Sequence, residues 1–199
     1  MVNFERLTDE ELAMLYIGGN DSAFDELLSR TQEKVFSYIM FVVKDVEIAN
    51  DLFQDTFVKI IVRLQQGRYV SSGKLLFWMI RIAHNNIMDW YRKQKNDRII
   101  ELYDTKELSN LAPTSHYGIN REDEYVNEQV HRDVKKLMQL LPPTQREVVY
   151  MRFYQNLSFK EISEITGVSI NTSLGRMRYA LLNMRKMAND HHIELRLEQ

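Results

Sequence analysis

Apolar residues recur at helical spacing along the first half of the chain, and this pattern predicts four helices. The first opens at a Thr-x-x-Glu capping box, and Asp45 can cap the third. Glycines mark the ends of the first and third helices. The predicted segments cover residues 8–18, 24–42, 45–67 and about 74–96. Four amphipathic helices with short connections predict a compact bundle.

Helical periodicity fades between residue 97 and about residue 124, where Asn, Pro, Ser, Thr and Gly gather. This acidic stretch is long for a loop inside one domain and is typical of a linker. We therefore expect two domains, over residues 1–96 and 127–199, with a flexible linker over 97–126.

Periodicity returns at Tyr125, and Pro142-Pro143 interrupts it. Two further capping boxes, at residues 144–147 and 158–161, are expected to open two helices. Ser169 is expected to cap a last helix that runs to about Met187. No strand is predicted, because 7 Gly and 3 Pro supply little turn chemistry for a sheet. The fold class expected is all-α, with an N-terminal helical bundle and a small C-terminal helical domain.

Composition narrows the class of protein. Cysteine is absent, which excludes disulfides, thiolate zinc sites and a cysteine nucleophile. The N-terminus lacks a signal-peptide pattern, and no apolar run nears the ~20 residues that span a bilayer. A cytoplasmic protein without membrane insertion is expected.

Charge is unevenly distributed although the net charge is only −2. Residues 61–98 carry a net charge of +6 and residues 169–188 a net charge of +4, with acidic stretches elsewhere. Two basic blocks suggest two surfaces that bind a polyanion such as nucleic acid. The alternative is a solvated mosaic of charges.

Residues 159–178 follow the helix-turn-helix plan of a short helix, a three-residue turn and a longer helix. Gly167 can supply the positive φ of the turn. The second helix begins with small polar residues, and no acidic residue falls between 169 and 188. This is typical of a helix that enters the major groove. An ordinary helical hairpin with a basic exposed face is the alternative.

Apolar packing between the two helices of the motif is expected from Ile162, Val168 and Ile170. Ser173 falls where the motif usually has a β-branched apolar residue. We expect the neighbouring Leu174 to serve in its place.

DNA contacts within the motif divide by position, because the first two turns of the second helix reach into the groove and the flanks meet the backbone. Asn171, Thr172 and Arg176 are the candidates for base edges. Lys160 and Arg178 are the candidates for phosphates, although Arg178 can serve either role. The full candidate set is Lys160, Ser169, Asn171, Thr172, Ser173, Arg176 and Arg178.

The helix predicted over 74–96 carries more large apolar residues than one buried stripe needs. Aromatic residues interspersed with Arg and Lys suit single-stranded DNA, where bases stack and cations hold phosphates. Residues 77–80 are expected to belong to the core of the bundle. For Trp90, Tyr91, Arg92 and Lys93, DNA contact and core packing both stay open.

Asp51, Gln54 and Asp55 are expected on one side of the third helix, with apolar residues on the other. Two carboxylates at this spacing could form an acid/base or metal pair. No third ligand lies nearby in sequence, which favours a protein-binding surface or a solvated face. No metal or cofactor is predicted.

Three blocks of sequence together resemble the extracytoplasmic-function sigma factors of the sigma-70 family. Residues 51–57 resemble the stretch with which that family docks on core RNA polymerase. Residues 77–85 resemble its −10 segment, and residues 140–148 with the helix-turn-helix resemble its −35 domain.

The resemblance implies a factor that is not an enzyme and that directs transcription initiation with core RNA polymerase at promoter DNA. It implies polymerase contacts by Asp51, Gln54 and Asp55 and a −10 specificity pocket in the loop over 68–74. The −10 candidates are Arg68, Ser71, Ser72, Lys74, Asn85, Trp90, Arg92 and Lys93. An anti-sigma factor is a further expected partner.

Two other functions would account for part of the sequence. A helix-turn-helix regulator that does not join polymerase would explain residues 140–188 but not 50–57 or 77–85. A hydrolase using Asp51 and Asp55 would explain less still.

Overall fold

The computed structural model describes residues 4–97 and 133–190, and most of both stretches is helical. No strand is present in these two stretches, which confirms the all-α fold class. The linker expected over 97–126 lies outside the described residues except for Asp97, where α4 ends. The expected start of the second domain at 127 lies outside them too. Residues 4–97 are called the N-terminal part and residues 133–190 the C-terminal part.

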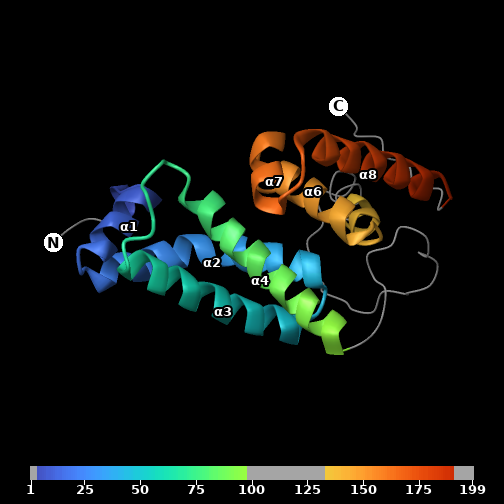
Figure 1. The fold of residues 1–199 in the computed structure, drawn as a ribbon. Coiled ribbons are helices and arrows are strands. Elements are labelled where there is room, and N and C mark those ends of the chain that lie inside the picture. Colours follow the sequence, from blue (N-terminus) through green and yellow to red (C-terminus); the bar gives the residue numbers. More distant parts are fainter. Residues whose placement is uncertain (1–3, 98–132, 191–199) are drawn as a thin grey trace, which may run out of the picture. The chain divides into compact units, whose positions relative to one another are not determined.

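The helices of the N-terminal part are η1 Phe4–Arg6, α1 Asp9–Ile17, α2 Asp21–Val43, α3 Val46–Gln65 and α4 Leu75–Asp97. Short connections join α1, α2 and α3, and a longer loop leads from α3 to α4 (Figure 1). In the C-terminal part, residues 133–139 are helical. They are followed by α6 Pro143–Phe153, α7 Phe159–Thr166 and α8 Ile170–Asp190.

Side-chain caps explain where the first three long helices begin. Thr8 and Glu11 form the predicted capping box of α1, with each side chain bonded to the other residue's backbone amide. Asn20 caps α2 by accepting a hydrogen bond from Ala23 N at 3.2 Å. Asp45 caps α3 by accepting from the next turn's amides at 2.9 and 3.1 Å. Each cap satisfies backbone donors that the helix itself leaves free.

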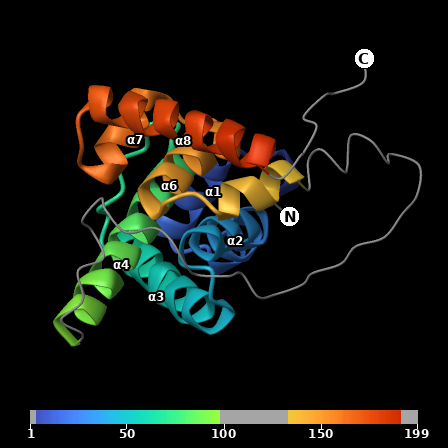
Figure 2. The same cartoon turned by 90° about the vertical axis from the view of Figure 1, so that its right-hand side faces the viewer.

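α2, α3 and α4 pack against one another, and α1 packs on α2 and α3 (Figures 1 and 2). Their shared core consists of large side chains that are completely buried, namely Leu12, Leu27, Tyr38, Ile39, Ile60, Leu64, Met79, Ile80 and Ile87. The buried Tyr38 hydroxyl lies 3.3 Å from Nδ1 of His84, which joins α2 to α4. The predicted four-helix bundle is confirmed.

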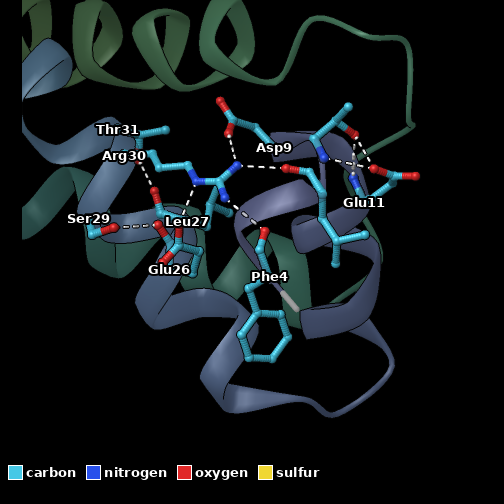
Figure 3. Close-up of polar contacts among 10 residues, drawn as sticks. Phe4, Asp9, Glu11, Glu26, Leu27, Ser29, Arg30 and Thr31 are labelled. Atoms are coloured by element: carbon cyan, nitrogen blue, oxygen red, sulfur yellow. Dashed lines mark hydrogen bonds and ion pairs between the residues drawn. The ribbon is translucent and has the colours of Figure 1, made fainter. Parts of the chain in front are cut away.

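Arg30 on α2 binds the backbone of η1 and of the residue that follows it (Figure 3). Its guanidinium donates to the carbonyl oxygens of Phe4 at 2.8 Å and Leu7 at 2.6 Å. The same group pairs with Glu26 at 2.6 Å and with Asp9 at 3.5 Å. Because these contacts satisfy several of its donors at once, Arg30 holds η1 and the first turn of α1 against α2.

The start of α6 differs from the prediction. The helix begins at Pro143 instead of at a Thr144 capping box, and no side chain caps it. Proline is favoured at the first helical position, where its missing N–H costs no hydrogen bond. Thr144 is therefore already inside the helix.

α6 packs against α8 in the C-terminal part. Asn183 on α8 donates to Oε1 of Gln145 on α6 at 2.8 Å. The buried side of α8 is a stripe of small and flexible residues at helical spacing, namely Ser173, Met177, Ala180, Met184 and Ala188. The other residues of α8 are exposed or half-buried.

Candidate polymerase and nucleic-acid interfaces

The candidate polymerase contacts lie on one exposed face of α3. Asp51, Gln54 and Asp55 are all exposed. The neighbouring Leu52 and Phe57 are buried and hold α3 in the bundle. The structure thus places the three polar residues on the solvent side of α3 and the apolar ones on its buried side, as the sequence predicted.

The loop over 68–74 joins α3 to α4, and Tyr69 is its one buried residue. Tyr69 is only 6% exposed, and its ring packs on that of Trp78 at a centroid distance of 4.9 Å. Val70 is 81% exposed. The candidate DNA contacts of the loop are all exposed, namely Arg68, Ser71, Ser72 and Lys74.

Two glycines bracket the loop with backbone conformations that other residues rarely adopt. Gly67 has φ 63° and Gly73 has φ 71°. At positive φ a side chain would be strained, so glycine lets the chain turn sharply at both ends. Residues 68–72 therefore form a loop that continues neither α3 nor α4.

Sequence reasoning missed three residues of this region. Val70 stands exposed at the centre of the loop, and Tyr69 anchors the loop beneath it. Glu10, on α1, accepts hydrogen bonds from Tyr69 and from Ser71, the latter at 2.8 Å. The sequence indicated Val70 only by its apolar character in a polar loop between two glycines. Nothing in the sequence indicated a role for Glu10.

Burial raises the pKa of the Tyr69 phenol above its ordinary value, and the hydrogen bond to the Glu10 carboxylate raises this pKa further. A phenolate beside that carboxylate would be repelled. Tyr69 therefore remains a hydrogen-bond donor to Glu10 throughout the physiological pH range.

One side of α4 presents an exposed stripe at helical spacing. Its members are Arg81, Asn85, Asp89, Arg92 and Lys93. Arg92 forms an exposed ion pair with Asp89 at 2.6 Å, and such pairs are weak enough for a phosphate to displace.

The aromatic residues of α4 divide between core and surface. Met79 and Ile80 are completely buried, as expected for the core segment 77–80, whereas Phe77 and Trp78 are half-buried. Trp90 is also half-buried and packs edge to face on Tyr91 at 4.8 Å. Trp90 therefore has surface for both core packing and DNA contact.

The helix-turn-helix has the predicted local geometry. α7 ends at Thr166, Gly167 has φ 69°, and α8 begins at Ile170. The Ser169 hydroxyl accepts from the backbone N of Thr172 at 3.0 Å and so caps α8. Its oxygen also lies 2.8 Å from the Thr172 hydroxyl.

The −35 candidates differ in how exposed their side chains are. Lys160, Asn171, Thr172 and Arg178 are exposed, as is Ser169, and Arg176 is half-buried. Ser173 differs, because its side chain is completely buried and its Oγ has no hydrogen-bond partner. In this conformation Ser173 belongs to the packing stripe of α8 and is not available to DNA.

Packing in the motif also departs from the prediction at two apolar residues. Leu174 and Ile170 are each 44% exposed. Ser173 itself occupies the inward position that Leu174 was expected to fill. Ile162 is completely buried, as predicted, and Val168 is half-buried.

Within residues 4–97 and 133–190, no helix combines the length and apolarity needed to cross a bilayer. The same residues contain no group of three or more His, Asp or Glu side chains that could hold a metal ion.

Comparison with known proteins identifies the family. Residues 27–97 match the family described as Sigma-70 region 2, and residues 131–178 match Sigma-70, region 4. Together the two matches cover more than half of the chain. The chain therefore belongs to the sigma-70 family of RNA polymerase sigma factors, and its relatives include extracytoplasmic-function members. Such a factor directs promoter-specific initiation of transcription.

Individual relatives align along almost their whole length. RNA polymerase sigma factor YlaC of Bacillus subtilis (strain 168) is 28% identical over 176 residues, which cover 86% of this chain and 97% of YlaC. ECF RNA polymerase sigma factor SigW of the same organism is 25% identical, with 86% and 92% covered.

A solved structure shares the fold. The sigma factor RpoE of Bartonella quintana, in complex with the anti-sigma factor NepR, has a TM-score of 0.63 to this chain at 19% identity. The similarity covers 83% of this chain and 96% of RpoE.

Proposed function

We propose that each of the exposed surfaces described above carries one step of promoter recognition. The face of α3 that holds Asp51, Gln54 and Asp55 binds core RNA polymerase. The loop over 68–74 takes up unpaired bases of the −10 element. The N-terminal half of α8 enters the major groove of the −35 element.

The observation that supports this division is that the candidate contact residues stand on exposed faces whose opposite sides are buried. On α3, Asp55 is exposed while Thr56 beside it is completely buried. On α8, Asn171 and Thr172 are exposed while Ser173 is completely buried. The buried partners fix each helix, so the exposed residues are presented without further folding.

Charge on the exposed faces matches a polyanion. Arg81, Arg92 and Lys93 lie along the exposed side of α4, where they are placed to hold the phosphates of a single strand. Arg176, Arg178 and the exposed Lys160 serve the duplex at the −35 element. Asn85 and the half-buried Trp90 complete the −10 surface.

The factor acts as a binding subunit and not as an enzyme, and it works in the cytoplasm. An anti-sigma factor that covers the polymerase-binding face would hold it inactive. RpoE of Bartonella quintana was solved in complex with an anti-sigma factor, NepR. A helix-turn-helix regulator that acts without polymerase does not account for the match of residues 27–97 to Sigma-70 region 2.

Transcription in vitro from a promoter library tests the proposal. The factor is mixed with core polymerase, and both the −35 and −10 positions are randomised. We expect one −35 and one −10 motif to be enriched together in the transcripts. Sequence-specific DNA binding by the free protein, without any polymerase-dependent transcript, would instead support the regulator.

Residue variants separate the surfaces in the same assay. Asn171→Ala is expected to alter only the −35 motif, and Ser72→Ala only the −10 motif. If Ser72→Ala changes the −35 motif instead, the assignment of the two surfaces is wrong.

A further inference from the structure

One carboxylate on α1 holds the promoter-recognition loop at two points. Glu10 accepts a hydrogen bond from the Tyr69 hydroxyl through Oε1 and another from the Ser71 hydroxyl through Oε2, at 2.8 Å. These partners lie 59 and 61 residues away in sequence. The match to Sigma-70 region 2 begins only at residue 27, so α1 lies outside it.

α1 is itself firmly placed, which makes it a suitable support. Leu12 and Ala13 are completely buried against the rest of the bundle. Arg30 binds the backbone just before α1, as Figure 3 shows. At the other end of α1, the Tyr16 hydroxyl accepts a hydrogen bond from Nε2 of Gln65 at 2.8 Å. Gln65 is the last residue of α3, just before the loop.

The Glu10 contacts fall on alternate residues of the loop. Tyr69 and Ser71 bond to α1, whereas Val70 between them is 81% exposed. The exposed Ser72 forms hydrogen bonds with Tyr69. Holding Tyr69 in place therefore also sets the positions of Val70 and Ser72. The low exposure of Tyr69 means that its bond to a carboxylate competes little with water.

We infer that Glu10 is a positioning residue for promoter recognition. It fixes the loop so that Val70 and Ser72 are presented to the unpaired bases of the −10 element. This inference rests on the proposed role of the loop, and it adds α1 to the elements that determine promoter specificity.

The test uses the full chain with core polymerase and the variants Glu10→Gln and Glu10→Ala. Discrimination is measured as the ratio of transcription from the preferred −10 element to that from single-base variants. We expect Glu10→Ala to lower this ratio about tenfold, the size expected for loss of a hydrogen bond to a charged group. Glu10→Gln keeps the shape and one acceptor, so its loss should be smaller. The −35 preference and the affinity for core polymerase should not change.

Three further measurements exclude indirect effects. Asp25→Asn removes an exposed carboxylate from α2 and is the charge-matched control. Tyr69→Phe removes one of the two donors, and adding it to Glu10→Ala should increase the loss little, because that variant has already lost the bond. Hydrogen exchange over residues 68–74 should speed up in the Glu10 variants, because the loop loses its anchor.

The outcomes are distinguishable. If Asp25→Asn lowers the discrimination ratio as much as the Glu10 variants do, the effect comes from the change in net charge and the inference is overturned. Unchanged discrimination in both Glu10 variants, with Val70→Ala or Ser72→Ala still altering the −10 preference, would overturn the positioning role and leave the loop's proposed function intact. If no loop variant alters the −10 preference, the proposed function of the loop fails and the inference fails with it.

Discussion

The side-chain amide of Asn86 on α4 donates a hydrogen bond to the hydroxyl of Thr56 on α3, at 2.9 Å. Both residues are buried, and the Thr56 hydroxyl donates in turn to the carbonyl of Leu52 at 2.6 Å. Asn86 Oδ1 also accepts from Nζ of Lys59. Each central residue is the chain neighbour of a candidate contact residue, Asp55 on α3 and Asn85 on α4. Buried side chains thus join α3 and α4 next to the proposed polymerase and DNA contacts.

Replacing Asn86 with Ala should destabilise the N-terminal bundle. The change leaves the buried Thr56 without its donor and removes the partner of Lys59, so we expect a loss of about 1–3 kcal/mol in the free energy of unfolding. Both tryptophans of the chain, Trp78 and Trp90, lie on α4. Urea unfolding followed by tryptophan fluorescence therefore reports on this bundle.

The control for this change is Thr56→Val, which removes the hydroxyl but keeps the shape. Adding it to Asn86→Ala should cost less than the sum of the two single losses, since the pair shares one hydrogen bond. Strictly additive losses would mean that the bond contributes nothing to stability.

Gln54→Ala combined with Asp55→Ala should weaken binding to core polymerase and leave the fold intact. Both side chains are exposed and occupy the polar face of α3, so their loss should change stability by less than ~0.5 kcal/mol. Competition for core polymerase against a labelled sigma factor measures the affinity. The matched control is Gln32→Ala with Glu33→Ala, an exposed Gln and acidic pair on α2. Unchanged affinity in the α3 double variant would refute the docking assignment.

The sequence predicted those features that local chemistry determines. Ser169 caps α8 because a hydroxyl at a helix start can accept an orphan backbone amide, and Gly167 turns the chain because it lacks a Cβ. The same reasoning located α2, α3 and α4 and the exposed polar face around Gln54.

Features that depend on tertiary packing were not predictable in this way. Thr144 looked like a cap, yet Pro143 starts α6 because its fixed φ already suits a helix. Ser173 and Leu174 are adjacent, and which of them turns inward depends on the rotation of α8 against its neighbours. The bonds of Glu10 to a loop some sixty residues away leave no periodic signal in the sequence.

Ser173→Ala should leave the free energy of unfolding unchanged or raise it by up to about 1 kcal/mol. The Ser173 hydroxyl is completely buried without a hydrogen-bond partner, so removing it relieves a desolvation cost. Thermal unfolding followed by circular dichroism measures the change.

The same substitution also tests whether the Ser173 side chain contacts DNA. Ser173→Ala should leave the −35 preference of the holoenzyme unaltered, whereas Asn171→Ala at an exposed position should change that preference with little effect on stability. A relaxed −35 preference in Ser173→Ala would show that this side chain reaches DNA after all.

Arg176→Ala and Lys160→Ala should weaken −35 binding in two different ways. Arg176 lies in the second turn of α8, which we propose to enter the groove, whereas the exposed Lys160 lies at the start of α7, which we propose to face the DNA backbone. Loss of a base contact should cost ~1–3 kcal/mol at one base pair and relax the preference there. Loss of a phosphate contact should weaken binding to all sequences alike and reduce the salt slope by about one unit. Holoenzyme binding to a set of −35 variants at several salt concentrations separates these results. If Arg176→Ala lowers the affinity for every variant equally, Arg176 does not contact base edges and the proposed placement of α8 in the groove is wrong.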